Sequence, residues 1–294
     1  MTATGNTFRI VHLSDLHLTR TDGRRRSSPN IFKELKGMNA AFRRLVQTPL
    51  LQKSSLIIVT GDVTDRGDIE TWKFFWDTLK AAGLYDRVLA VPGNHDVCCL
   101  GLRKPGIGAH KEDDLQKAVD GLKLGGQPYS FPWVRVPDPR VAVFGVNSNN
   151  AGNATGATNA LGFIDFYQFE KLARLLYKHR AVPVKIVALH HSPNIPMPET
   201  SKRRGVDHTL IERLASCVPQ AQRQTLRLLC LTHRVRLVLH GHLHVYEDRY
   251  VNSLRMIGSA ASTEPVSKGK GFPIMEYTLD NKLHLHPKQH ICPV

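Results

Sequence analysis

Residues 55–62 read Ser-Leu-Ile-Ile-Val-Thr-Gly-Asp, a run of apolar, mostly β-branched residues that ends in a glycine and a carboxylate. Short apolar runs of this kind are typical of buried strands. Five other runs have the same form, with polar residues directly after the apolar part. They occupy residues 8–17, 87–96, 141–148, 184–191 and 235–244. The recurrence predicts a fold whose strands end in polar side chains.

Helical patterns lie between these predicted strands. Apolar residues recur about every 3.6 positions over three segments, and a fourth segment is helical in part and broken around Val218-Pro219. The four segments are residues 32–47, 68–83, 165–179 and 209–232. Alternating strands and helices predict an α/β fold whose sheets are covered by helices and whose ligand crevice lies at the carboxyl ends of the strands. We therefore expect the polar strand ends to meet.

The C-terminal segment, residues 246–294, has a different character. Its apolar runs predict an antiparallel β meander, with strands at residues 249–251, 254–257, 272–279 and 282–286. Two polar segments, residues 100–127 and 149–162, are expected to form an insert or cap of loops and short helix. Because no internal repeat or linker is visible, we expect a single domain over residues 1–294.

The composition excludes several classes of protein. The 294 residues are 41% hydrophobic and 22% charged, which is ordinary for a packed soluble chain and excludes wholesale disorder or a fibrous repeat. No run approaches the roughly 18 apolar residues of a membrane span. Residues 1–6 lack the features of a signal peptide. Five scattered cysteines suit a reducing compartment, so we expect a cytoplasmic protein without a membrane span.

The chain is strongly basic. Forty Lys and Arg residues against twenty-five Asp and Glu residues give a net charge of +15, which favours a phosphate ester, nucleic acid or an anionic membrane surface as partner. Several basic side chains follow the predicted strands, at Arg20, Arg24, Arg25, Arg26, Arg103, Lys104, Lys202, Arg203, Arg204, Lys268 and Lys270. They are expected either to ring the site and attract anionic substrates or to be solvated loop residues.

Seven polar residues at the strand ends are of types that bind metals: Asp15, His17, Asp62, Asn94, His190, His242 and His244. Asp15 and His17 are two positions apart, so on an extended segment their side chains point the same way, and His242 and His244 repeat this spacing. Seven ligands are too many for one ion and suit a pair of ions about 3.5–4 Å apart. Oxygen and nitrogen ligands without a thiolate favour Mn, Fe, Zn, Co or Ni, of which we expect Mn, Fe or Zn.

Five motifs resemble, in order, the sequence blocks of the calcineurin-like metallophosphoesterases. They are Asp15-Leu16-His17, Gly61-Asp62-Val63-Thr64-Asp65-Arg66-Gly67, Gly93-Asn94-His95-Asp96, His190-His191 and Gly241-His242-Leu243-His244. Residues 60–65 and 189–193 look most like the branch with bacterial cyclic nucleotide phosphodiesterases and glycerophosphodiesterases. The resemblance implies a four-layer αββα sandwich of two mixed sheets flanked by helices, with a dinuclear metal centre at one edge.

The resemblance also implies how the two ions are held. One ion would take Asp15, His17, Asp62 and His244. The other would take Asp62, Asn94, His190 and His242, so that Asp62 bridges the pair. His190 is preferred to His191 because it ends the predicted strand first. The nucleophile would be a hydroxide that bridges the ions.

Three further residues are catalytic candidates by the same resemblance. His95 would be the leaving-group acid or a phosphate donor, and Asp65 would orient it. Arg66 resembles a phosphate-binding arginine, although its side chain could also point away. Asp96 is expected to be a helix cap or turn residue, and His240 to serve packing.

The predicted function is that of a metal-dependent phosphodiesterase, which would hydrolyse a P–O bond of a small phosphodiester or cyclic nucleotide. A DNA or RNA nuclease, or another phosphoesterase acting on a polyanion, is the first alternative, because the positive charge favours it. The sequence has no zinc-finger or helix-turn-helix signature to support it. A non-catalytic scaffold with the same fold is the second alternative, against which the intact ligand set counts. The sequence leaves the oligomeric state open.

Overall fold

The structure is a computed structural model that describes residues 7–25, 36–97, 112–149, 160–198, 210–265 and 270–293. Seven of the basic residues predicted near the site lie outside these ranges, as do residues 100–111 and 150–159 of the two predicted inserts. The seven are Arg26, Arg103, Lys104, Lys202, Arg203, Arg204 and Lys268.

The first sheet has five strands in the order β11-β10-β1-β2-β3. The strands are β1 (Phe8–Leu13), β2 (Leu56–Thr60), β3 (Val88–Val91), β10 (Phe272–Leu279) and β11 (Leu285–Cys292). β1, β2 and β3 run parallel, whereas β10 pairs antiparallel with both β1 and β11. The sheet is therefore mixed, as the resemblance implied.

The second sheet has six strands in the order β4-β5-β6-β7-β9-β8. The strands are β4 (Trp133–Asp138), β5 (Val141–Gly145), β6 (Val184–Ala188), β7 (Leu237–His240), β8 (Glu247–Val251) and β9 (Leu254–Gly258). The four central strands run parallel, and the edge strands β4 and β8 are antiparallel to their neighbours.

The C-terminal strands differ from the single meander that the sequence predicted. β8 and β9 form one antiparallel hairpin, and β10 and β11 form another. The two hairpins join different sheets, because β9 pairs with β7 whereas β10 pairs with β1. Apolar alternation identifies a strand but not the neighbour it pairs with, so the split was not visible in the sequence.

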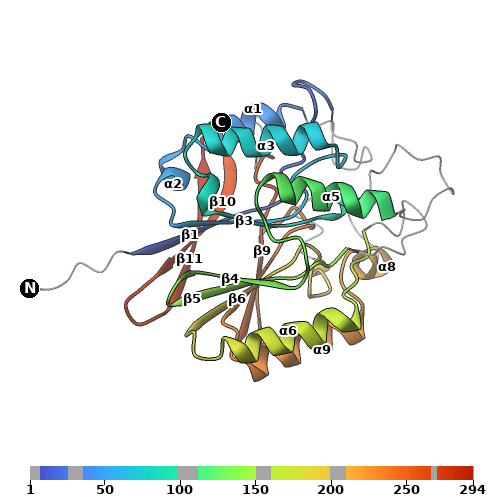
Figure 1. The fold of residues 1–294 in the computed structure, drawn as a ribbon, viewed down its shortest axis with the longest axis vertical. Helices are drawn as coiled ribbons and strands as arrows, with labels where there is room; N and C mark the ends of the chain where they lie inside the picture. The colour runs from blue at the N-terminus through green and yellow to red at the C-terminus, as the bar shows by residue number, and fades with distance from the viewer. Residues whose placement is uncertain are drawn as a thin grey trace, which may run out of the picture.

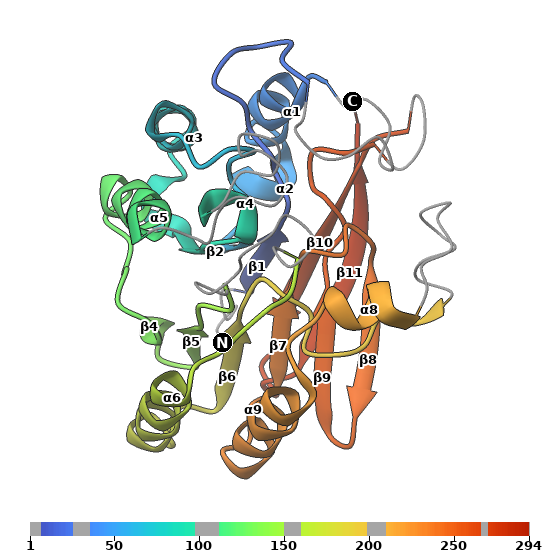
Figure 2. The same ribbon diagram turned by 90° about the vertical axis from the view of Figure 1, so that its right-hand side faces the viewer.

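Helices cover the outer face of each sheet, which gives four layers (Figures 1 and 2). On the first sheet lie α1 (Met38–Leu45), α2 (Pro49–Gln52), α3 (Ile69–Ala81) and α5 (Glu112–Leu124). On the second lie α6 (Phe166–Lys178) and α9 (Gln220–Thr232). The other helices within the described ranges are short: η2 (Tyr85–Arg87), α4 (Asn94–Val97) and α8 (Leu210–Ala215). The predicted αββα sandwich is confirmed.

Neighbouring side chains of a strand point to opposite faces of the sheet, so each strand contributes to two hydrophobic cores. In β1, Ile10 faces the second sheet and belongs to the core between the sheets, while Val11 belongs to the core under the helices. α3 begins at Asp68, whose carboxylate accepts the Thr71 N–H at 3.2 Å, a typical N-cap. Its buried face carries Trp76, whose indole N–H donates to the Gly121 carbonyl of α5 at 2.8 Å. The first contact fixes the start of α3, and the second joins α3 to α5.

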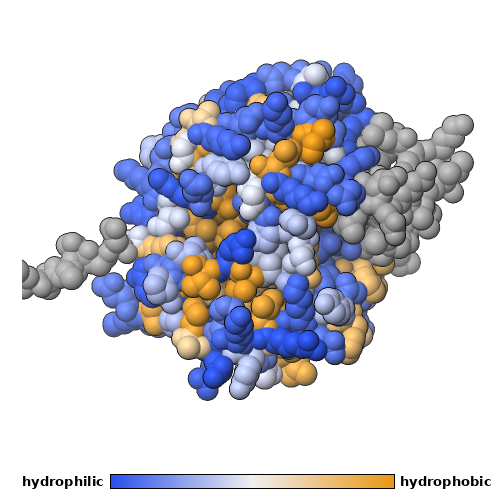
Figure 3. Space-filling view, viewed as in Figure 1, coloured by the Kyte–Doolittle hydropathy of each residue, from blue (hydrophilic) through white to orange (hydrophobic). Residues whose placement is uncertain are grey.

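Most of the surface in the view of Figure 3 is hydrophilic, with hydrophobic residues gathered across the middle of the face. Val136 on the edge strand β4 is 45% exposed and Tyr129 is 50% exposed. Among the described residues, no helix has both the length and the apolar character needed to cross a bilayer.

Candidate metal centre

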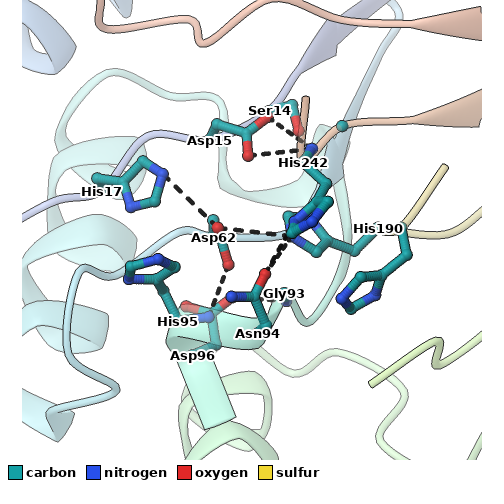
Figure 4. A network of polar contacts seen from close by, with 12 residues as sticks. Ser14, Asp15, His17, Asp62, Gly93, Asn94, His95, Asp96, His190 and His242 are labelled. Carbon is teal, nitrogen blue, oxygen red and sulfur yellow. Dashed lines mark hydrogen bonds and ion pairs between the residues drawn. The ribbon is translucent and has the colours of Figure 1, made fainter. Parts of the chain in front are cut away.

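The carboxyl ends of five parallel strands bring all seven predicted ligands together, and Figure 4 labels all of them except His244. β1 and β2 lie in the first sheet and are followed by Asp15, His17 and Asp62. Asn94 follows β3 of that sheet, whereas His190 and the His242 to His244 segment follow β6 and β7 of the second sheet. The site therefore spans the edge where the two sheets meet, as expected for a crevice at strand ends.

Five of the seven predicted ligands have a left-handed backbone. The φ angles are 53° at Asp15, 44° at His17, 50° at Asp62, 69° at His242 and 56° at His244. From the sequence we expected Asp15 and His17, and likewise His242 and His244, to lie on extended segments. This expectation was wrong. Left-handed backbone at residues other than glycine is uncommon and gathers at functional sites, where the surrounding structure holds it in place.

Two glycines let the loops approach each other closely. A Cβ at Gly93 would lie 2.2 Å from Oδ1 of Asp62, and a Cβ at Gly241 would lie 1.8 Å from Oγ of Ser14 and 2.7 Å from Oδ2 of Asp15. Any side chain at either position would therefore displace a carboxylate or the loop that carries it.

One cluster contains Asp15, His17, Asp62 and His244, whose ligand atoms lie within 4.8 Å of one another. Nε2 of His17 lies 3.1 Å from Nε2 of His244 and 3.6 Å from Oδ2 of Asp62. Nε2 of His244 lies 3.3 Å from Oδ1 of Asp15. Metal–ligand bonds of about 2.1 Å place neighbouring ligand atoms roughly 3.0–3.4 Å apart, so these four groups fit around one ion.

A second cluster contains Asp62, Asn94, His190 and His242. Oδ1 of Asn94 lies 2.9 Å from Nε2 of His190 and 3.1 Å from Nδ1 of His242. Nε2 of His190 also lies 3.3 Å from Nδ1 of His242 and 3.5 Å from Oδ2 of Asp62. These spacings fit a second ion, and the same Asp62 oxygen borders both clusters.

In two of the histidines, the ring nitrogen Nδ1 lies beside an oxygen that accepts a hydrogen bond. Nδ1 of His190 donates to the Thr60 carbonyl at 2.7 Å, and Nδ1 of His244 lies 2.8 Å from Oε1 of Glu264. Such bonds keep the proton on Nδ1 and turn Nε2 toward the site, so that a bound metal can replace the Nε2 proton. Without metal, burial lowers the pKa of His190, but the charge of Asp62 raises it overall to about 9. Glu264 was missed from the sequence, because nothing in the chain around it marks a carboxylate that supports a histidine twenty residues earlier.

His191 is turned to a different partner from His190. The Ser148 hydroxyl oxygen accepts the backbone N–H groups of His190 and His191 at 3.2 and 3.0 Å, and lies 3.0 Å from Nδ1 of His191. The hydroxyl thus has its own proton free to donate to Nδ1 of His191. Although a ring nitrogen of His191 lies within 4.8 Å of ring nitrogens of His190 and His242, this bonding and the contacts of His190 with Asn94 favour His190 as the ligand.

His95 lies beside the first cluster. Its backbone N–H donates to Oδ1 of Asp62 at 2.8 Å, and its ring meets the His17 ring edge-on with centroids 4.6 Å apart. Nδ1 of His95 lies 3.1 Å from the backbone carbonyl oxygen of Asp65 and 3.9 Å from its carboxylate. Asp65 therefore contacts this ring chiefly through its main chain.

The Asp65 carboxylate lies between two other partners. Its Oδ1 is 3.8 Å from Nδ1 of His17, and its Oδ2 is 3.5 Å from Nε of Arg66. The Arg66 side chain is 23% exposed and lies along this carboxylate.

Asp96 ties two loops together. Its carboxylate accepts the N–H groups of Gly93, Val63 and Thr64 at 2.9, 3.2 and 2.8 Å, and the Thr64 hydroxyl at 2.9 Å. Burial, and then the charge of Asp62, raise the pKa of Asp96 to about 7. Its role is that of the turn residue that the sequence predicted.

Charges within the metal-free site compensate one another. Burial raises the pKa of Asp62, but the positive charges of His190 and His95 hold it well below its ordinary value. Burial, and then neighbouring His191, lower the pKa of His242 well below its ordinary value, so this ring is neutral and able to bind a metal. Burial also lowers the pKa of His240 to about 4, in keeping with its predicted packing role.

The chain is similar to known proteins in sequence and in fold. A family model described as calcineurin-like phosphoesterase matches residues 8–246. A "Probable cyclic nucleotide phosphodiesterase" of Xenorhabdus bovienii (strain SS-2004) is 21% identical over 291 residues, which cover 93% of this chain and 97% of that protein.

Two solved structures have a similar fold. A dimetal phosphatase from Danio rerio aligns with a TM-score of 0.64 at 10% identity, covering 97% of this chain and 98% of that one. A phosphopantetheinyl hydrolase from Mycobacterium tuberculosis aligns with a TM-score of 0.52 at 15% identity, covering 87% and 91%. At such identities the likeness concerns the fold alone.

Proposed function

The chain belongs to the calcineurin-like phosphoesterase family and is a metal-dependent phosphoric ester hydrolase, and we propose that it hydrolyses a P–O bond of a small phosphodiester or cyclic nucleotide at the centre formed by Asp62 and its neighbours. The similarity to a protein named as a cyclic nucleotide phosphodiesterase supports this substrate class. We further propose that Mn, Fe or Zn ions occupy the centre, and that the chain acts as a single domain in the cytoplasm.

The position of one carboxylate oxygen carries the proposal. Oδ2 of buried Asp62 lies 3.6 Å from Nε2 of His17 in one cluster and 3.5 Å from Nε2 of His190 in the other. A ligand shared by two ions must border both ligand sets at once. When bound, two such ions would act as a Lewis acid toward the phosphoryl group and lower the pKa of a coordinated water.

His95 is suited to the leaving group. Nδ1 of His95 donates to the Asp65 carbonyl, so Nε2 is the ring nitrogen left to meet a substrate. When protonated, Nε2 would donate a hydrogen bond to the phosphoryl group or a proton to the departing oxygen. The hydrogen bond from the His95 N–H to Asp62 keeps the ring at a fixed position relative to the proposed bridging ligand.

Two carboxylates against two divalent ions leave the centre positive, which suits an anionic ester. The net charge of +15 also keeps a polyanionic substrate such as DNA or RNA as the second candidate.

A substrate panel tests the proposal. Metal-stripped protein resupplied with Mn²⁺, Fe²⁺ or Zn²⁺ would be assayed with bis-p-nitrophenyl phosphate, cyclic AMP, 2′,3′-cyclic AMP, glycerophosphodiesters and single-stranded DNA. We expect hydrolysis of the chromogenic diester and of at least one small diester only when metal is present. Cleavage of DNA alone would move the assignment to a nuclease, and no metal-dependent hydrolysis of any substrate would contradict it.

A further inference from the structure

Besides the metal centre, a second charged site borders the loop that follows β6. A half-open pocket of about 270 Å³ lies between this loop, helix α9 and the edge strand β8. It is lined by Ile195, Gln220, Arg223, Gln224, Arg227 and Arg249, which we call the arginine pocket. Half of its lining residues are arginines, and none of the six belongs to the candidate metal centre.

Arg223 brings a buried positive charge to this pocket. It is only 6% exposed, and its Nη1 donates to the Val218 carbonyl at 2.6 Å and to Sγ of Cys217 at 3.1 Å. Burial raises the pKa of the Cys217 thiol, so both acceptors are uncharged. Among the side chains that the structure describes, no carboxylate forms an ion pair with Arg223. A buried charge without a counter-charge is costly, which favours an anionic ligand beside it.

The other two arginines hold the loop with one end of each guanidinium. Nη2 of Arg227 donates to the Pro193 carbonyl at 3.2 Å and to the side-chain oxygen of Asn194 at 2.8 Å. Nη1 of Arg249 donates to the Ile195 carbonyl at 2.8 Å, with Oε1 of Glu247 3.8 Å away.

Each of the three guanidinium groups has N–H donors that are not used in hydrogen bonds to the described residues. The second terminal nitrogen of Arg223, Arg227 and Arg249 forms no hydrogen bond with a residue in the described ranges. Nε of Arg227 is buried and has no hydrogen-bond partner there either.

Like charges crowd one another in this pocket. Burial, and then the positive charges of Arg223 and Arg249, lower the pKa of Arg227. Helix α9 also begins here, at Gln220, and has no side-chain cap at its N-terminus. The positive end of its dipole adds to the guanidinium charges.

We propose that the arginine pocket binds the phosphoryl group of a small phosphate monoester or of free phosphate, at a site separate from the metal centre. Planar guanidinium forks match phosphate oxygens in pairs, and several positive charges favour a dianion over a carboxylate. The volume is several times the roughly 30 Å³ share of one water, enough for a phosphoryl group and part of its substituent.

A short segment of the chain joins the arginine pocket to the metal centre. Pro193, Asn194 and Ile195 follow the candidate ligand His190 within five residues, and Arg227 and Arg249 donate to all three. A ligand that draws on these arginines therefore competes with the bonds that hold the loop after His190.

Equilibrium dialysis of the metal-loaded enzyme with labelled inorganic phosphate tests the proposal. We expect two phosphates per chain, one at the metal centre and one in the pocket, and only one for the double variant Arg227→Gln/Arg249→Gln. The matched control Arg174→Gln/Arg236→Gln removes two exposed arginines and should keep both phosphates. Displacement of the pocket phosphate by 5′-AMP would identify a nucleotide as the source, whereas phosphate binding that AMP leaves unchanged would identify free phosphate.

Equal phosphate stoichiometry in the wild type and the Arg227→Gln/Arg249→Gln variant would overturn the proposal, as would an equal loss in the control variant. If the double variant fails to fold, as judged by circular dichroism, Arg249→Lys serves instead. It keeps the charge but loses the fork, so we expect about tenfold weaker binding of the second phosphate. Unchanged affinity would then overturn the proposal.

Discussion

The candidate metal centre and the arginine pocket lie at either end of the loop 190–195, yet they balance charge in opposite ways. In the metal centre, the carboxylates of Asp15 and Asp62 alternate with imidazoles whose proton can leave, so the site is prepared for cations. In the arginine pocket, three guanidiniums that keep their protons face carbonyl and amide oxygens and the carboxylate of Glu247, so positive charge is in excess and the site is prepared for an anion. The kind of basic residue thus determines which ligand a buried polar site accepts.

The largest expected effect concerns the bridging carboxylate. Asp62→Ala removes a ligand from both clusters, so we expect loss of at least one bound ion and a fall in kcat/KM toward bis-p-nitrophenyl phosphate of about 10³-fold or more, since metal ions contribute several kcal/mol. Metal content by plasma mass spectrometry and initial rates check this. The exposed Asp77→Ala on α3 is the control, and equal activity in the two variants would contradict the account.

Next in size is His95. His95→Asn removes the proposed proton donor but no proposed ligand, so kcat should fall about 10²–10⁴-fold while metal content stays at the wild-type level. The effect should be smaller for a nitrophenolate leaving group, which needs little protonation, than for a cyclic nucleotide. A loss of metal together with activity would instead make His95 part of the metal centre.

Glu264 should have a more moderate effect. Glu264→Gln weakens the acceptor that orients His244, and we expect metal affinity to fall about 10- to 100-fold with activity restored at high metal concentration. Titration of activity with Mn²⁺ measures this, with the exposed Glu70→Gln as control. A variant that titrates like the wild type would show that Glu264 does not support the ligand.

The smallest expected effect concerns the reactivity of two cysteines. It tests whether the arginine pocket activates the thiol of Cys217. Burial raises the pKa of Cys217 despite the contact with Arg223, and raises the pKa of Cys230 to about 12. Thiols remain protonated below their pKa, so at pH 7–8 iodoacetamide should leave both cysteines unmodified in the native enzyme and modify both after denaturation. Rapid native modification of Cys217, read by peptide mass spectrometry, would show that the guanidiniums stabilise a thiolate.

Sequence patterns predicted the parts of the fold that depend on local order. Strand β2 with Asp62 after it, and β6 with His190 after it, follow from apolar runs and the rule that crevices form at strand ends. The five sequence motifs predicted the family, which the match over residues 8–246 confirms.

Features that depend on long-range packing were not predictable. The left-handed backbone at Asp15 and His242 results from the surrounding loops rather than from local propensity. The contact of Glu264 with His244 and the grouping of Arg249 with Arg223 join segments that no periodicity connects. The division of the C-terminal hairpins between two sheets depends on strand partners in the same way.

Anomalous diffraction from a crystal of the Mn²⁺-loaded enzyme would test the shared position of Asp62 most directly. The account predicts two peaks about 3.5–4 Å apart, one within bonding distance of His17 and His244, the other of Asn94 and His190, with a carboxylate oxygen of Asp62 between them. A single peak, or two peaks that do not share Asp62, would contradict it.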